Sequence, residues 1–347
     1  MAPVFTDVSE KPTLRPWSVQ RLLLLLTVCL VTWAMVAAGC LMIGSTSFGV
    51  PTDDIRHLFH EGKLGNVLRF RIEWTVVASL VGACLALAGV TYQAVLRNPL
   101  ADPYLLGVAS GSSLAVFLWT IFPLAIFGPF SQQGIAFIGA IATLLVVFSL
   151  SLRRGRLEPM RLLLVGVIVN AINGSFYLLL FHLGRNQDIA RAFRFLAGGL
   201  QQDLKISQIQ FVATTFAMGL ALLLYLSGQL NISTLTEAEA ESLGVRIHRL
   251  RWVAMLAASL VTAAAVAISG PIGFVGLVCP HVGRLLVGND QRKLVPVAVA
   301  MGAILLAVAD AASRMLGQVP VGVITGFLGG PFFLFLLWRS RQTGAPS

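Results

Sequence analysis

Two polar pairs in this sequence have a spacing that places both members on one face of a helix. Asp310 and Arg314 are four residues apart, which allows a same-face ion pair, and Asn170 and Asn173 are three apart. An ion pair near a helix end is either structural or part of an ion site. Amides in an apolar helix either bond to a neighbouring helix or line a cavity. The sequence leaves both alternatives open.

No catalytic or metal-binding pattern accompanies these pairs. The sequence contains no GxxxxGK[ST] phosphate loop, so the chain is not expected to hydrolyse ATP by itself. The four cysteines lie in apolar stretches without metal-ligand spacing, and the histidines are scattered. "GVASG" resembles a serine protease motif, but Val108 stands where that motif needs glycine. We therefore expect no enzyme activity, no metal site and no cofactor.

The composition indicates an all-α integral membrane protein. Of the 347 residues, 56% are hydrophobic and 12% are charged. About 20 apolar residues span a bilayer, and ten stretches qualify: 20–44, 72–95, 104–121, 133–152, 160–182, 207–228, 250–268, 273–288, 294–313 and 320–338. The first could be a cleaved signal ending in "AAGC", but its apolar run is too long. We expect an N-terminal tail (1–18), one transmembrane domain (19–340) and a C-terminal tail (341–347).

The net charge of +10 does not indicate nucleic acid, because the basic residues are dispersed over loops that flank the apolar stretches. With both termini in the cytoplasm, most of the 25 lysines and arginines fall on the inner side. The topology with two cytoplasmic termini is therefore favoured. A smaller basic set stays outside and needs its own explanation.

Three polar connections are long enough to have a role. Residues 45–71 and 185–206 lie outside on this topology, and the second contains "DIARAFRFLAGGL", which has helical spacing. The third, 234–251, lies inside; its alanines and glutamates predict a short helix of about ten residues that stops at Leu243 and Gly244. A polar helix on the inner face needs a partner to dock on.

Irregular backbone is expected at three places inside the apolar region. These are "RNPLADPYLLGVASGSS" from Arg97, "SGPIGFVGLVCPH" from Ser269 and "GQVPVGVITGFLGGPFF" from Gly317. Such backbone is tolerated at membrane depth only against protein or a water-filled cavity. Asn98, Pro99 and Asp102 predict a sharp turn on the cytoplasmic side, with Arg97 at the inner interface.

Three segments resemble the signatures of the FecCD-type permeases of bacterial importers for iron-siderophores, haem and cobalamin. They are "LVGACLALAGVTYQAVLRNPLADPYLLGVASGSSLAV", "ISGPIGFVGLVCPHVGRLLVGNDQRKLVPVAVAMGAILLAVADAASR" and "VPVGVITGFLGGPFFLFLL", within residues 71–338. The resemblance implies the type II fold of ATP-driven importer permeases, with ten helices in the inner membrane. It also implies a homodimer, two cytoplasmic ATPase subunits and a periplasmic or lipid-anchored substrate-binding protein, surrounded by membrane lipid.

The resemblance also assigns roles to residues. The segment at about 234–245 is similar to the part that docks on the ATPase, and the matching residues are Glu237, Ala240, Leu243 and Gly244. Arg56, Arg71 and Arg314 match outer basic residues that meet the binding protein. The pathway and its inner gate are implied at Pro159, Met160, Asn170 and Asn173, with Glu158 beside them.

The sequence departs from the family pattern at three positions. "RIEW" at Arg71–Trp74 replaces a motif with a proline and a second arginine, Gln318 replaces an acid, and Thr236 replaces a glycine. The first two leave docking and cargo open. Ferric siderophore is the expected cargo, with haem or cobalamin as alternatives. An ion-coupled secondary transporter and a non-transporting receptor are the other readings that the sequence leaves open.

Overall fold

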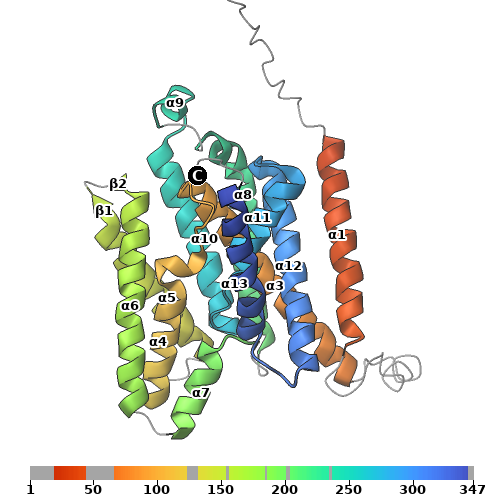
Figure 1. Cartoon of the computed structure of the whole chain (residues 1–347), viewed down its shortest axis with the longest axis vertical. Coiled ribbons are helices and arrows are strands. Elements are labelled where there is room, and N and C mark those ends of the chain that lie inside the picture. Colours follow the sequence, from red (N-terminus) through yellow and green to blue (C-terminus); the bar gives the residue numbers. More distant parts are fainter. Residues whose placement is uncertain are drawn as a thin grey trace, which may run out of the picture.

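The computed structural model is a bundle of helices (Figure 1), and it describes residues 19–43, 66–122, 132–153, 156–183, 186–200, 204–233 and 237–342. Its helices are α1 (Val19–Leu41), α3 (Asn66–Val95), the 3-10 helix η1 (Pro103–Leu106), α4 (Val108–Ile121), α5 (Gln132–Ser151), α6 (Pro159–Leu183), α7 (Asn186–Leu196), α8 (Ile206–Ile232), α9 (Glu237–Ser242), α10 (Ile247–Ser269), α11 (Val275–Val287), α12 (Gln291–Met315) and α13 (Val321–Gln342). Between α5 and α6, β1 (Leu152–Arg153) and β2 (Arg156–Leu157) pair as an antiparallel hairpin.

The predicted spans are confirmed as helices. Seven described helices are long and apolar enough to cross a membrane, and three shorter apolar ones lie at Val108–Ile121, Val275–Val287 and Val321–Leu334. Each overlaps one of the ten expected stretches. In Figure 1, α1 begins and α13 ends near the end of the bundle that carries α9, while α7 lies at the opposite end. We call these the α9 end and the α7 end.

Helices α3, α10 and α12 form the centre of the bundle. The apolar window of α3 is 83% buried and that of α10 is 78% buried, whereas that of α1 is 6% buried. Glycine permits the close packing here: a Cβ added to Gly82 would come within 2.0 Å of the Gly302 carbonyl oxygen. At Gly89 the Gly276 carbonyl oxygen is equally near. These contacts confirm that the small residues let helix backbones approach each other.

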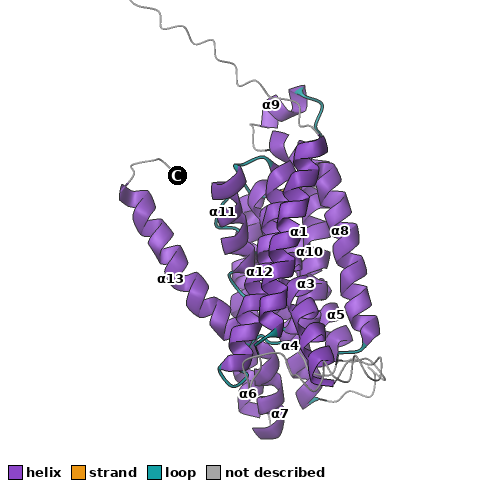
Figure 2. Ribbon diagram, turned by 90° about the vertical axis from the view of Figure 1, so that its right-hand side faces the viewer, coloured by secondary structure: helices purple, strands orange, loops and turns teal. Residues whose placement is uncertain are grey.

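Helix α13 leaves the bundle along its length (Figure 2). Its first residues pack near α11 and α12, and its later part diverges toward the α9 end. Phe327 is 79% exposed on this helix, and Leu334 is 68% exposed. Such apolar surface is compatible with a membrane, or with a second chain, around this helix.

Two of the expected irregular segments meet inside the protein. η1 begins after Asp102 and ends at Gly107, whose φ of +79° suits glycine. The segment between α10 and α11 contains Gly270 with a φ of +64°, and the amide of Ile272 donates to the Tyr104 hydroxyl. The irregular backbone is therefore packed against protein, as membrane depth requires.

Candidate functional site

The short polar helix predicted near residue 240 is present as α9, and it projects beyond the rest of the bundle (Figure 1). The predicted stop is confirmed, because Gly244 has a φ of +79° and its amide donates to the Glu241 carbonyl at 2.9 Å. The Val245 amide donates to the Ala240 carbonyl at 3.1 Å. The helix has six residues where about ten were predicted, and residues 234–236 lie outside the described part.

Two of the residues that match the family's docking segment, Ala240 and Leu243, differ in their exposure. Ala240 has no exposed surface and belongs to the main core cluster of the chain. Leu243 is 59% exposed. Ala240 therefore attaches α9 to its own bundle, and Leu243 offers an apolar side chain to a partner. Among the described residues of the segment, Leu243 is the position to test for docking.

The turn that follows α3 is held by its own side chains, as predicted. The Asn98 Oδ1 accepts from the Leu100 amide at 2.9 Å, and the Asp102 Oδ1 accepts from the Tyr104 amide at 2.8 Å. Burial raises the pKa of Asp102 to about 6, although the bond from the Tyr104 amide lowers it. This carboxyl is the N-cap of η1.

Asp102→Asn is expected to stabilise the protein increasingly as the pH rises from 4 to 8. The folded pKa of Asp102, about 6, is above its ordinary value, so the protonated carboxyl contributes stability below about pH 4 that is lost as the pH rises through 6. Asparagine keeps the acceptor and cannot ionise. Thermal-unfolding midpoints of the asparagine variant and the wild type across this pH range measure the difference. The Asp102→Ala variant, which removes the cap, should have a lower midpoint than the wild type at every pH. A pH-independent difference for the asparagine variant would contradict the burial of this carboxyl.

Helix α6 begins at the proposed gate. Pro159 is its first residue, Met160 is 75% exposed, and Arg161 pairs with Glu158 at 2.9 Å on the surface. Further along, the Asn170 amide donates to the Tyr104 carbonyl at 3.0 Å and the Asn173 amide donates to the Ser110 hydroxyl at 2.8 Å. Both amides thus bond to a neighbouring element, the first of the two alternatives. A role in a pathway stays a prediction.

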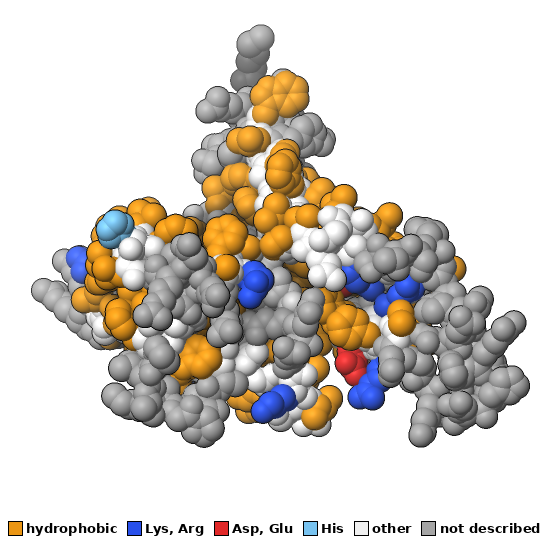
Figure 3. Space-filling view, turned by 90° about the horizontal axis from the view of Figure 1, so that it is seen from below, with side chains coloured by type: hydrophobic (Ala, Val, Ile, Leu, Met, Phe, Trp, Pro, Cys, Tyr) orange, Lys and Arg blue, Asp and Glu red, His pale blue; other side chains and the backbone are white. Residues whose placement is uncertain are grey.

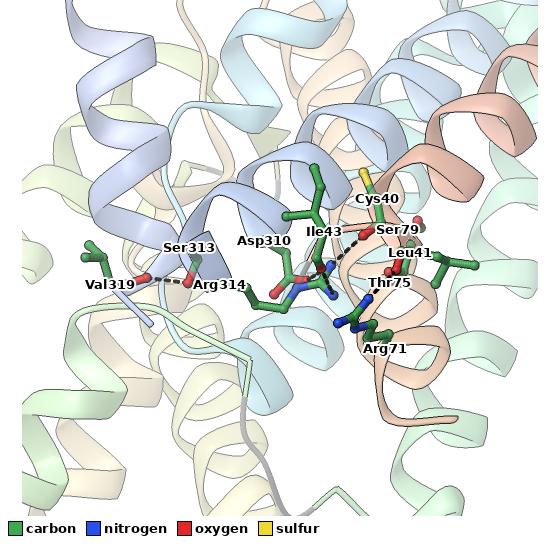
Figure 4. A network of polar contacts seen from close by, with 10 residues as sticks. All are labelled: Cys40, Leu41, Ile43, Arg71, Thr75, Ser79, Asp310, Ser313, Arg314 and Val319. Carbon is green, nitrogen blue, oxygen red and sulfur yellow. Dashed lines mark hydrogen bonds and ion pairs between the residues drawn. The ribbon is translucent and has the colours of Figure 1, made fainter. Parts of the chain in front are cut away.

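A polar cluster joins α1, α3 and α12 at the α7 end (Figure 4). The predicted pair is confirmed: Arg314 and Asp310 are 3.2 Å apart, and their side chains are 8% and 0% exposed. Arg314 also donates to the Ile43 carbonyl at 3.3 Å and to that of Cys40 at 3.5 Å. Arg71 donates to the Leu41 carbonyl at 3.0 Å. Two arginines therefore bind carbonyls at and just after the C-terminus of α1, where the last carbonyls of a helix lack the intrahelical partners that its interior has.

This cluster gives Arg71 a structural role that the sequence did not reveal, and it favours the structural alternative for the pair of Asp310 and Arg314. Both arginines are buried, with 6% and 7% of their surface exposed, so they are not open cations on the outer face of the chain. Arg56, the third predicted docking residue, lies outside the described residues. Figure 3, which views the α7 end, shows the described basic side chains spread among apolar ones. Docking by these arginines stays a prediction.

A contact at the α9 end was also missed from the sequence. Arg97 donates its Nε–H to the Ser233 carbonyl at 2.8 Å, across 136 residues. Ser233 is the C-cap of α8 and comes just before residues 234–245, which we call the coupling segment after the role that the resemblance implies. The only feature of the sequence that could have pointed to this contact is the residue type of Arg97, because it stands just after a helix, where glycine is favoured.

The comparisons with known proteins agree over nearly the whole chain. The sequence model of the FecCD transport family matches residues 18–339 of this chain. The chain belongs to the FecCD transport family. The hemin transport system permease protein HmuU of Yersinia pestis is 36% identical over 313 residues, which cover 87% of this chain and 93% of that protein. The vitamin B12 import system permease protein BtuC of Vibrio cholerae is 36% identical over 281 residues, 80% of this chain and 84% of that protein.

A solved structure confirms the fold of this FecCD chain. A metal-chelate type ABC transporter in an inward-facing conformation is 28% identical, with a TM-score of 0.78, over 92% of this chain and 99% of that chain. The all-α architecture predicted for type II importer permeases is therefore correct, and the chain is a multi-pass membrane permease.

Proposed function

We propose that this permease moves a metal chelate, most readily a ferric siderophore, across a bacterial inner membrane by alternating access. It works as a homodimer with two cytoplasmic ATPase subunits and an external binding protein, with both termini in the cytoplasm. The observation that carries the proposal is the exposed Leu243 directly after α9, a helix that projects beyond the bundle. The chain belongs to the FecCD family and has no phosphate loop of its own. Such a chain needs a separate source of energy.

Closure of the ATPases on ATP would push the two α9 helices together and tilt the permease halves. The cavity between them then exchanges outer access for inner access. This is a population shift between two packed arrangements, driven by contacts that differ between them. Ala240, buried in the chain's own core, makes α9 move with the bundle rather than alone.

The proposed pathway runs beside α6 and α13, which present apolar surface to a second copy or to lipid. Met160 lies at the α9 end of α6, where an inner gate is required, and α13 diverges toward the same end (Figure 2). The amides of Asn170 and Asn173 hold α6 against η1 and α4. These two residues then act on the pathway by positioning α6.

Docking of the binding protein is proposed at the α7 end. Arg56, which lies outside the described residues, remains the candidate from the sequence, because Arg71 and Arg314 bind the end of α1. The contribution of these two arginines would be to fix the end of α1 at the end of the bundle where docking is proposed.

The cargo is tested by loading the purified binding protein from the same gene neighbourhood with ferric hydroxamate, ferric catecholate, haemin and cobalamin in turn. A relative that transports haemin and one that imports vitamin B12 have the same identity to this chain, 36%. The siderophore proposal predicts tight binding of a ferric siderophore and weak binding of the other two. If the binding protein preferred haemin or cobalamin, that compound would be the cargo instead of a siderophore, and the proposal that the chain is an importer permease would still stand.

A further inference from the structure

Arg97 occupies a position that favours glycine. It lies two residues after the end of α3 and has a φ of +50°, and the Asn98 amide donates to the Gln93 carbonyl at 3.2 Å, as at a glycine-terminated helix end. A side chain in this left-handed conformation costs about 1 kcal/mol relative to glycine. The strain is retained where the side chain has a function elsewhere.

The side chain of Arg97 reaches the start of the coupling segment. Its Nε–H donates to the Ser233 carbonyl at 2.8 Å, and Ser233 is 3% exposed. The same end of α8 is bound to α12: the Asn231 amide donates to Asp290 at 2.8 Å, and the Gln291 amide donates to Asn231 at 2.8 Å. The end of α8 is thus bonded both to Arg97 and to the start of α12, so these parts should move together.

From Arg97 a short, rigid segment leads to α6. The turn at 98–102 is braced by Asn98 and Asp102, and its Ala101 is fully buried. η1 follows at once, and its Tyr104 carbonyl accepts from the Asn170 amide of α6 at 3.0 Å. On the same helix, a Cβ at Gly166 would come within 2.0 Å of the Leu105 carbonyl oxygen. η1 therefore cannot shift without moving α6.

We infer that Arg97 is a positioning residue that transmits movement of the coupling segment, through the turn at 98–102 and η1, to α6. The inference rests on the proposed coupling to an ATPase. It adds a specific path of contacts within one chain. Arg97 bonds to Ser233, the backbone of residues 97–104 leads to Tyr104, and Tyr104 accepts from Asn170. The contacts alone establish adjacency, so the test must measure coupling between the two ends.

The test uses Arg97→Gly in the complete transporter, because glycine keeps the helix end and removes only the side chain. Spin labels at Leu164 on α6 and Leu316 after α12, which are 60% and 64% exposed, report movement of α6 when MgATP and orthovanadate are added. The four native cysteines are replaced by alanine for labelling. Arg21→Ala on α1, exposed near the same end, is the matched control.

In the wild-type and Arg21→Ala transporters, the distribution of distances between the spin labels at positions 164 and 316 is expected to shift when MgATP and orthovanadate are added. In Arg97→Gly the shifted fraction should fall about tenfold, which lies within the range of about 5- to 150-fold for coupling between sites, while ATP hydrolysis continues. Arg97→Lys, which keeps a cationic donor, should recover most of the shift. A wild-type shift in Arg97→Gly, or loss of its ATPase subunits, would overturn the inference. No shift in the wild type would count against the proposed ATPase coupling itself.

Discussion

Replacing Leu243 by arginine is expected to abolish ATP-driven uptake while leaving the permease folded. Leu243 is 59% exposed at the end of α9, so the chain itself tolerates a larger, charged side chain there. In a packed contact with an ATPase subunit, the same charge is desolvated without a partner, which costs several kcal/mol. Since about 1.4 kcal/mol is a factor of ten, uptake should fall by at least about tenfold.

Uptake of the loaded cargo into proteoliposomes measures this effect, and pull-down of the ATPase subunits shows whether docking is lost. Leu243→Met is the matched control, because it keeps an apolar side chain of similar size and should transport normally. Ala240→Arg is a less specific choice: Ala240 is fully buried in the chain's own core, so that variant would disturb the attachment of α9 as well. Wild-type uptake by Leu243→Arg would show that α9 does not dock on the ATPase.

Arg314→Met is expected to destabilise the permease more than any exposed substitution. It leaves the fully buried Asp310 without its cation and removes bonds to two carbonyls at the end of α1. Breaking a buried pair by removing one partner costs about 3–5 kcal/mol. The thermal-unfolding midpoint in detergent measures the loss.

The double variant Asp310→Asn, Arg314→Met separates charge from packing. Removing the buried charge as well should recover part of the midpoint lost in Arg314→Met, because the uncompensated carboxylate is gone. Arg194→Met, an exposed arginine on α7 at the same end of the bundle, is the control and should unfold like the wild type. If Arg314→Met kept the wild-type midpoint and only lost binding of the external protein, Arg314 would be a docking residue and not an anchor of α1.

The spans were predictable because a bilayer demands about 20 apolar residues for each crossing, and that demand is visible in composition. The turn at Asn98 and Asp102 and the stop at Gly244 were predictable for a similar reason, since local backbone geometry selects these residue types. The pair of Asp310 and Arg314 follows from helical spacing alone.

What the sequence did not reveal are contacts between residues far apart in the chain. The resemblance implied outer docking roles for Arg71 and Arg314, and no local pattern shows that these side chains bind the end of α1. The bond from Arg97 to Ser233 and that from Asn170 to Tyr104 depend on how whole helices pack. The spacing of residues within one helix does not show which other helix that helix packs against.

We propose that ATP hydrolysed on a separate subunit drives transport through this chain. The most direct measurement is uptake of the cargo into proteoliposomes that contain the permease and its ATPase, with the loaded binding protein outside and MgATP inside. Uptake should require MgATP and the ATPase subunit, and it should persist when a protonophore collapses the proton gradient. Uptake without the ATPase that stops when the gradient collapses would contradict the account and identify an ion-coupled transporter.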